Sequence, residues 1–271
     1  MTVLQAIILG VVQGVTEFLP ISSSGHLVII PYLLGWEVPS TSFDVMLHLG
    51  TVTAVVGYFW RDLAEIATAF LRTGGEAQAG RRVGFLVAVG TVPAVIAGYF
   101  LESTFEKFFL NPPAVAGFLL ITGLLLIGTG VLIEVGEDVG SKRRGLGRMK
   151  IRDAVYIGMM QALAIAPGIS RSGTTISMGL FLGLKRETAA RYSFLLSIPV
   201  IAGAAVLKMR HGIGGSGVSN PALIAGFLAA ALSGFAAVWF LMNFIRRHSL
   251  RVFAYYCWVV GAGVLALHFF R

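Results

Sequence analysis

Six apolar runs, each long enough to cross a lipid bilayer as a helix, dominate the amino-acid sequence. A helical span takes about 17–25 residues with few charges. The runs are Phe43–Trp60, Val83–Leu101, Ala114–Glu134, Tyr192–Met209, Ala222–Asn243 and Val252–Phe270. Only 13% of the 271 residues are charged, whereas soluble domains carry roughly 25%. The sequence therefore predicts an all-α integral membrane protein, with one transmembrane domain over residues 1–271.

Two further apolar regions, Val3–Gly35 and Asp153–Gly183, do not have the pattern of simple spans. Each is interrupted near its middle by proline, glycine and a serine cluster. Pro20 lacks a backbone donor, and the serines and glycines favour a turn. Such irregular backbone survives at membrane depth only where protein surrounds it or water lines it. Each region is therefore predicted to be a re-entrant hairpin of two short helices, in addition to the six transmembrane helices.

The two hairpins align with each other without gaps. At an offset of 148 residues, nine of the thirty positions from Ala6 to Gly35 are identical. Apolar composition alone explains alanine, leucine and glycine matches, but not Gln13 with Gln161 and two serine pairs in register. The pattern indicates a repeat of residues 1–135 in residues 149–271, joined by a basic cytoplasmic loop at 136–152. Three spans per half is an odd number, so the repeat is expected to have inverted topology.

The basic residues support this orientation. If Arg61–Arg82 is cytoplasmic, sixteen of the twenty-one lysines and arginines lie on that side, as the positive-inside rule requires. The first hairpin then enters from outside and the second from the cytoplasm. The formal charge of +8 does not indicate nucleic-acid binding, because the basic residues occupy short gaps between apolar runs.

The first hairpin carries a polar stretch from Gln13 to His26. An ionisable residue in a membrane segment usually marks a site, which makes Glu17 a candidate; Gln13 lies one turn before it, on the same face. Ser22, Ser23 and Ser24 precede or begin the second short helix. They form either a simple N-cap cluster or, with exposed N–H groups, an anion site. His26 could give or take a proton.

The second hairpin supplies the matching cation, Arg171, within Ser170-Arg171-Ser172-Gly173-Thr174. A guanidinium fork matches phosphate oxygens, and the alternative is pairing with a buried carboxylate. Neither a Walker A loop nor a dinucleotide glycine pattern is present, so a nucleotide site is not expected. Asp44 and His48, four residues apart at the start of a span, fit ordinary helix-dipole chemistry better than metal ligation.

At these residues the chain resembles the undecaprenyl pyrophosphate phosphatase family, also known as bacitracin resistance proteins. The first family motif ends in Phe-Leu-Pro-Ile-Ser-Ser-Ser-Gly-His and corresponds to Gln13–His26; the second, Pro-Gly-x-Ser-Arg-Ser-Gly-x-Thr, corresponds to Pro167–Thr175. The resemblance spans the whole length. Gln13 stands where some members have Glu, which argues against a mechanism with two carboxylates.

The resemblance implies hydrolysis of undecaprenyl diphosphate to undecaprenyl phosphate and phosphate, which recycles the lipid carrier of cell-wall synthesis. It also implies a divalent cation, Mg²⁺ or Ca²⁺, and a homodimer. The implied location is the bacterial plasma (inner) membrane, where the protein is multi-pass and its active site faces the periplasmic, outer side. The rival hypothesis, suggested by the inverted repeat, is a polyprenyl-phosphate transporter or flippase.

These observations assign a role to each candidate. Arg171 is expected to grip the diphosphate, and Glu17 to bind the cation or act as a base. Ser23 is the candidate nucleophile with His26 as its acid–base; direct attack by water, with His26 or Glu17 as base, is the alternative. The substrate-binding candidates are Gln13, Ser22, Ser24, Ser170, Ser172, Gly173 and Thr174.

Overall fold

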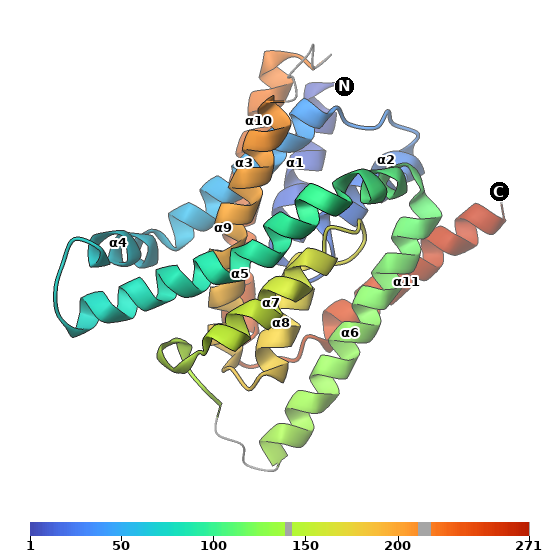
Figure 1. The fold of residues 1–271 in the computed structure, drawn as a ribbon. Helices are drawn as coiled ribbons and strands as arrows, with labels where there is room; N and C mark the ends of the chain where they lie inside the picture. The colour runs from blue at the N-terminus through green and yellow to red at the C-terminus, as the bar shows by residue number, and fades with distance from the viewer. Residues whose placement is uncertain (139–142, 211–217, 271) are drawn as a thin grey trace.

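The computed structural model describes residues 1–138, 143–210 and 218–270, which form helices joined by short loops (Figure 1). Part of the loop predicted at 136–152, residues 139–142, lies outside these ranges. The helices are α1 (Val3–Phe18), α2 (Ser23–Leu34), α3 (Thr41–Tyr58), α4 (Trp60–Ala69), α5 (Gly75–Glu106), α6 (Pro112–Asp138), α7 (Ile151–Leu163), α8 (Arg171–Phe181), α9 (Arg186–Arg210), α10 (Asn220–Phe244) and α11 (Arg251–Phe269), with short 3₁₀ turns at Lys107–Leu110 and Leu146–Arg148.

Five of the described helices, α5, α6, α9, α10 and α11, are each long and apolar enough to cross a membrane. The predicted run Phe43–Trp60 differs, because α3 and α4 meet there at a bend of 75° and make a sixth span only if the pair is counted as one. The bend falls where the apolar run ends and Arg61 and Asp62 begin. Asp62 forms an ion pair with Arg191 of α9, which fixes α4 in its new direction.

Both interrupted regions fold as two short helices separated by a turn, α1 with α2 and α7 with α8. The breaks fall at residues 19–22 and 164–170, where proline and serine predict them. Thr2 and Gln5 form a reciprocal capping box at the start of α1, and Ser170 caps α8 by accepting a hydrogen bond from the backbone N–H of Gly173. Pro20 to Ser22 and Ala166 to Gly168 are buried, so both turns lie inside the bundle and not at its surface.

Glycine allows two close helix crossings that hold the hairpins in place. Gly10 of α1 packs on the Gly226 carbonyl of α10, and Gly158 of α7 packs on the Gly90 carbonyl of α5. A Cβ atom at either position would collide with the facing backbone. Gly10 and Gly158 are also equivalent positions of the 148-residue offset. Elsewhere α6 packs along α11, and α3 packs against both α9 and α10.

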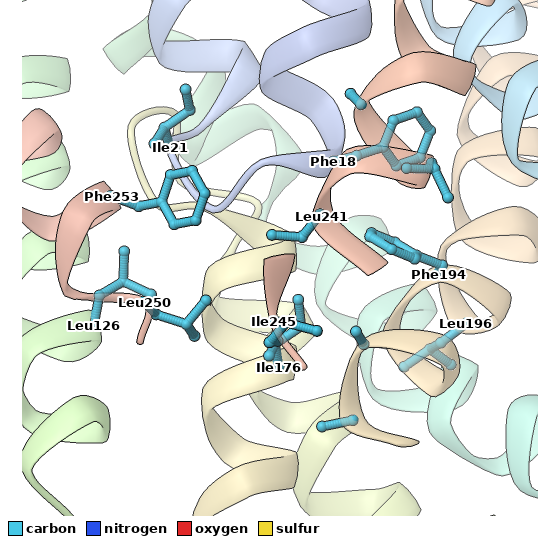
Figure 2. Packing of buried hydrophobic residues seen from close by; sticks show 14 of the residues in the cluster. Phe18, Ile21, Leu126, Ile176, Phe194, Leu196, Leu241, Ile245, Leu250 and Phe253 are labelled. Carbon is cyan, nitrogen blue, oxygen red and sulfur yellow. The ribbon is translucent and has the colours of Figure 1, made fainter. Parts of the chain in front are cut away.

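An apolar core lies around the two turns (Figure 2). Phe18 at the end of α1 packs edge-to-face on Phe194 of α9, with ring centroids 5.5 Å apart. Buried residues of α8, α10 and α11 complete this layer, among them Ile176, Leu241, Ile245 and Phe253. Polar groups enclosed by such a layer are cut off from bulk water, so their mutual interactions are stronger than at a surface.

Candidate active site

The first turn ends in a strained residue. Leu19 is the C-cap of α1, and Ser22, the N-cap of α2, has φ 68° and ψ 99°. Among the described residues, Ser22 is the one non-glycine residue with a positive φ. Its hydroxyl accepts a hydrogen bond from the N–H of Gly25 at 3.3 Å. Backbone strain of this kind persists only where surrounding contacts enforce it, and it clusters at functional sites.

The second turn is held by Thr122 of α6. The Thr122 hydroxyl donates to the Gly168 carbonyl at 2.9 Å and accepts from the N–H of Ser170 at 3.1 Å. Gly168 has φ 102°, and a Cβ there would collide with the Val115 carbonyl. Only glycine can adopt this conformation in so little space. The start of α8 is therefore fixed from α6 as well as from its own hairpin.

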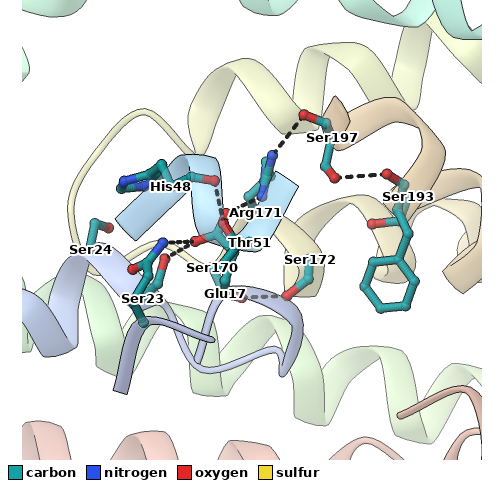
Figure 3. A network of polar contacts seen from close by, with 12 residues as sticks. Glu17, Ser23, Ser24, His48, Thr51, Ser170, Arg171, Ser172, Ser193 and Ser197 are labelled. Atoms are coloured by element: carbon teal, nitrogen blue, oxygen red, sulfur yellow. Dashed lines mark hydrogen bonds and ion pairs between the residues drawn. The ribbon is translucent and has the colours of Figure 1, made fainter. Parts of the chain in front are cut away.

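The two hairpin turns meet at an ion pair between Glu17 and Arg171 (Figure 3). The Glu17 side chain is 5% exposed and that of Arg171 is 16% exposed. Arg171 also donates to the Ser197 carbonyl of α9 at 3.4 Å. A buried guanidinium that keeps some access to the site, at the first residue of a helix, is well placed to bind an anion.

Glu17 collects two further hydrogen bonds from its own hairpin. The Gln13 side-chain amide donates to it at 3.0 Å, and the Ser23 hydroxyl donates to the same carboxylate oxygen, Oε2. The sequence hypothesis that Gln13 orients its neighbour agrees with this contact. Because Ser23 donates directly to a carboxylate, Glu17 is the group in position to take the Ser23 proton.

The remaining predicted residues of the second hairpin mostly hold the turns together. The Ser172 hydroxyl donates to the Leu19 carbonyl of the first turn at 3.1 Å and lies 3.2 Å from the Ser170 hydroxyl. The Thr174 hydroxyl donates to the Arg171 carbonyl at 3.0 Å. Ser170, Ser172 and Thr174 are all buried. In this arrangement they hold the start of α8, and with it Arg171, against the first turn.

His26 contacts partners other than Ser23, for which the sequence hypothesis made it the acid–base. Its Nδ1 is 2.7 Å from the Ser22 carbonyl, and its Nε2 is 2.8 Å from the Tyr256 hydroxyl of α11. The hydrogen bond of Ser23 goes to Glu17 instead. Ser24 contacts Ser22, with their hydroxyl oxygens 3.3 Å apart.

Several contributing residues lie outside the two hairpin motifs. Thr122, Ser197 and Tyr256 lie inside apolar spans, and each contacts a motif residue only through the fold. Thr175 of the second motif bonds to Ser193 at 2.6 Å, which joins α8 to α9. Hydropathy alone does not single these residues out, because single hydroxyls are common in transmembrane helices; the resemblance to the family covers the stretch Ala190–Pro199, which contains Ser193 and Ser197.

Glu17 and Gln13 bring a carboxylate and an amide oxygen to the first turn, which are the donor types that hard divalent cations bind. The Gln13 Oε1 atom is buried and has no hydrogen-bond partner among the described residues, and it lies on the side chain that contacts Glu17. Magnesium is usually bound by one or two carboxylates together with substrate phosphates. No group of three or more His, Cys, Asp or Glu side chains that could hold a metal ion occurs among the described residues. Asp44 and His48 contact each other, with His48 Nδ1 3.5 Å from Asp44 Oδ1, but they belong to no such group.

The fold and the site define a multi-pass membrane protein with a buried site built around the Glu17–Arg171 ion pair. The chain belongs to the family described as "Bacitracin resistance protein BacA", whose family profile matches residues 6–263. It is 46% identical over 278 aligned residues to the "Undecaprenyl-diphosphatase" of Geobacter sulfurreducens, with 100% of both chains covered.

Two further relatives carry the same name. The protein of Moorella thermoacetica is 45% identical, with 100% of both chains covered. That of Thermomicrobium roseum is 42% identical, with 98% of both chains covered. Both site motifs and all spans fall within the residues aligned with the Geobacter sulfurreducens and Moorella thermoacetica relatives, so the similarity covers the whole architecture and not one segment of it.

Proposed function

We propose that this chain hydrolyses undecaprenyl diphosphate by nucleophilic attack of Ser23 within the Glu17–Arg171 site. The chain is an undecaprenyl-diphosphatase, as its family and its full-length relatives of that name indicate. One observation carries the mechanism: the Ser23 hydroxyl donates to Glu17, and Glu17 in turn is paired with Arg171. A serine nucleophile needs an adjacent base, and Glu17 is adjacent.

The reaction proceeds in two displacements. Glu17 takes the Ser23 proton while Oγ attacks the terminal phosphorus, and the bond from that phosphorus to the bridging oxygen breaks. Undecaprenyl phosphate leaves and takes up the proton from Glu17. Water then attacks the phosphoserine, Glu17 accepts a proton from this water and returns it to the Ser23 oxygen, and inorganic phosphate is released.

Arg171 stabilises the charge on the transferring phosphoryl group. Phosphoryl transfer depends mainly on positioning and electrostatic stabilisation, and the guanidinium fork can bind two phosphate oxygens at once. The helix starts at Ser23 and Arg171 add backbone N–H groups and their partial positive charge. The substrate phosphate would compete with Glu17 for Arg171, which frees the carboxylate to act as a base.

Direct attack by water is the alternative that the sequence left open. Glu17 would then activate the water and the Ser23 hydroxyl would orient it. The direct hydrogen bond from Ser23 to Glu17 favours the serine route. Replacement of Ser23 by alanine separates the two, because it removes the nucleophile in one mechanism and only an orienting group in the other.

A divalent cation, Mg²⁺ or Ca²⁺, is proposed to be held by Glu17 and the Gln13 Oε1 atom, with substrate phosphate oxygens completing its coordination. Its chemistry would be to neutralise phosphate charge. The buried, unpartnered Gln13 oxygen supports this assignment. The proposal predicts that Gln13→Glu, which restores the acid of other family members, changes cation affinity more than it changes turnover.

The proposed topology is an inverted repeat of residues 1–135 in residues 149–271, with the site open to the outer face of the bacterial inner membrane. The equivalent glycines Gly10 and Gly158 make matching close contacts with α10 and α5, which supports the repeat. Exposed Glu37 should then be outside and exposed Lys150 inside. A membrane-impermeant maleimide applied to intact cells should label Glu37→Cys and not Lys150→Cys; the native Cys257 is buried.

Phosphate release in detergent tests the function itself. A transporter or flippase, the rival class, needs a membrane with two sides, whereas an enzyme turns over in micelles. We expect purified protein to release phosphate from undecaprenyl diphosphate, with loss of activity in Arg171→Ala. Arg246→Ala is the matched control, because Arg246 pairs with Glu187 at an exposed position. Tight substrate binding without phosphate release would refute the enzymatic assignment.

Light scattering of the same sample tests the proposed homodimer.

A further inference from the structure

Both ring nitrogens of His26 are occupied by fixed partners. A carbonyl oxygen can only accept, so the Nδ1 atom, 2.7 Å from the Ser22 carbonyl, carries the proton. In the neutral ring the Nε2 atom then accepts from the Tyr256 hydroxyl at 2.8 Å. His26 is 4% exposed. A buried neutral imidazole with both nitrogens bonded has no free position from which to exchange a proton with the substrate.

The Ser22 carbonyl is the atom through which His26 reaches the nucleophile. It accepts two hydrogen bonds from His26, one from the ring and one from the backbone N–H at 3.2 Å. Ser22 has the strained φ of 68°, and such a conformation persists only where surrounding contacts hold it. The peptide bond that His26 holds is the one directly before Ser23, whose hydroxyl meets Glu17.

Tyr256 supports His26 from the last helix. Its ring stacks on the imidazole with centroids 5.6 Å apart and an interplanar angle of 12°. The next residue, Cys257, approaches the same hairpin turn, with its sulfur 3.9 Å from the Pro20 carbonyl. Helix α11 therefore contacts both sides of the strained turn, 230 residues away from it in sequence.

We propose that Tyr256 is a positioning residue for the phosphatase reaction, and that it acts through His26 to hold the Ser22–Ser23 turn. The Tyr256 hydroxyl fixes the ring of His26, the ring fixes the Ser22 carbonyl, and the carbonyl fixes the direction of Ser23. His26 is in this account a structural link and not the proton donor of the reaction. The inference rests on the proposed role of Ser23 as the nucleophile.

The first test compares Tyr256→Phe with Tyr255→Phe in detergent-solubilised protein. Tyr256→Phe removes one neutral hydrogen bond and keeps the stacked ring, so kcat for undecaprenyl diphosphate should fall about tenfold, with KM within about twofold because no substrate contact is lost. Tyr255, exposed on the same helix and in contact with Trp258, is the control and should stay at the wild-type rate. A wild-type kcat in Tyr256→Phe overturns the proposal.

A spectroscopic readout separates positioning from general stability. In protein labelled with ¹⁵N-histidine, His26 should show the tautomer protonated at Nδ1. Tyr256→Phe should shift the Nε2 resonance, which loses its donor, and Tyr255→Phe should leave it unchanged. A His26 spectrum protonated at Nε2 in the wild-type protein would contradict the hydrogen-bond assignment on which the proposal stands.

A second pair of variants keeps the test decisive if Tyr256→Phe does not fold. The amide nitrogen of His26→Asn can still donate to the Ser22 carbonyl but cannot act as an acid or base, whereas His26→Ala loses both functions. We expect His26→Asn to be at least about tenfold more active than His26→Ala. Equal loss in the two variants overturns the positioning role.

Comparison of Ser23→Ala with the Tyr256 and His26 variants separates a failure of the positioning role from a failure of the proposed reaction. If wild-type protein releases phosphate and Ser23→Ala does not, the reaction assignment holds, and the tyrosine and histidine variants judge the positioning role alone. If Ser23→Ala keeps the wild-type rate while Tyr256→Phe is slow, the nucleophile assignment is wrong and the positioning of Ser23 falls with it.

Discussion

Arg171, the first residue of α8, forms a buried ion pair with Glu17, the penultimate residue of α1, across 154 residues of sequence. Neither hairpin alone contains both charges. The pair therefore forms only when the two turns meet, which makes the site a product of tertiary assembly. Removing one partner of a buried pair leaves an uncompensated charge, at a cost of about 3–5 kcal/mol.

Arg171→Lys should lower kcat/KM by about 100-fold or more, since an ammonium cannot bind two phosphate oxygens in a fork and loses transition-state contacts. Steady-state phosphate release in detergent measures the effect. The exposed Arg246→Lys is the control and should be silent, because exposed ion pairs contribute little. Arg171→Lys at the wild-type rate would mean that the fork does not hold the phosphate.

A double replacement separates stability from catalysis. Glu17→Gln alone should destabilise the protein, because Arg171 then lacks its counter-charge. Glu17→Met with Arg171→Met should recover thermal stability to the wild-type level or above, since buried pairs are often replaceable by apolar side chains, while phosphate release stays absent. A double variant less stable than Glu17→Gln would show that the ion pair itself holds the hairpins together.

Thr122→Val should weaken the second turn. The change keeps the shape of the side chain but leaves the N–H of Ser170 and the Gly168 carbonyl without their partner, which costs about 1–3 kcal/mol. Thermal unfolding in detergent measures this. Thr129→Val on the same helix is the control, since its hydroxyl donates to the Leu125 carbonyl of its own helix. Equal melting temperatures for the two variants would contradict the role of Thr122.

Gly10→Ala and Gly158→Ala, at the two repeat-related glycines, should lower the free energy of unfolding by similar amounts. A Cβ at Gly10 or Gly158 would collide with backbone of the facing helix, and overpacking of this kind costs about 1–3 kcal/mol. A methyl group at Gly98 would have no neighbour within 4 Å, so Gly98→Ala should be neutral or stabilising by up to about 1 kcal/mol. A destabilising Gly98→Ala together with a harmless Gly158→Ala would refute the packing account.

Chelation tests the proposed cation. Treatment with a chelator should abolish phosphate release, and added Mg²⁺ or Ca²⁺ should restore it. Gln13→Ala should raise the cation concentration needed for half-maximal activity, because the Gln13 Oε1 atom is one of the proposed ligands. Full activity in the presence of excess chelator would exclude a required cation at Glu17.

The meeting of the two hairpins near Glu17 and Arg171 could be predicted from sequence because charges are rare in this chain's apolar segments. The ion pair between them corresponds to the alternative interpretation of Arg171, pairing with a buried carboxylate. Each charge lies at the interruption of a hairpin, and the 148-residue offset relates the two hairpins. A charged residue inside a membrane segment usually marks a functional site. The same reasoning located the turns, since proline and clustered serines limit where a membrane helix can continue.

The contacts of His26 could not be predicted in this way. Sequence proximity suggested that His26 is the acid–base for Ser23. His26 lies three residues further along the helix, however, and its ring faces α11, where it contacts Tyr256. Tyr256 lies beside Tyr255 in an ordinary apolar span, and nothing local distinguishes the two. The two tyrosines differ because Tyr256 lies on the face of α11 that contacts the first hairpin. Tertiary packing determines which face that is.

The bend between α3 and α4 was missed for a similar reason. The run Phe43–Trp60 has the length and composition of a straight span. Its end is set by Arg61 and Asp62, and by the ion pair from Asp62 to Arg191 of α9. Contacts between residues far apart in sequence set the direction of a helix after a bend. A hydropathy pattern therefore predicts the length of an apolar run but not where the chain bends.

The most direct test of the account is phosphate release from undecaprenyl diphosphate by Ser23→Ala, Glu17→Gln and the double variant in detergent. Because Ser23 and Glu17 act as one unit, each single change should lower kcat by about 1,000-fold or more, and the double variant should be no slower than the slower single variant. Ser23→Ala with a turnover near that of the wild type would contradict the serine nucleophile and leave water, activated by Glu17, as the attacking group.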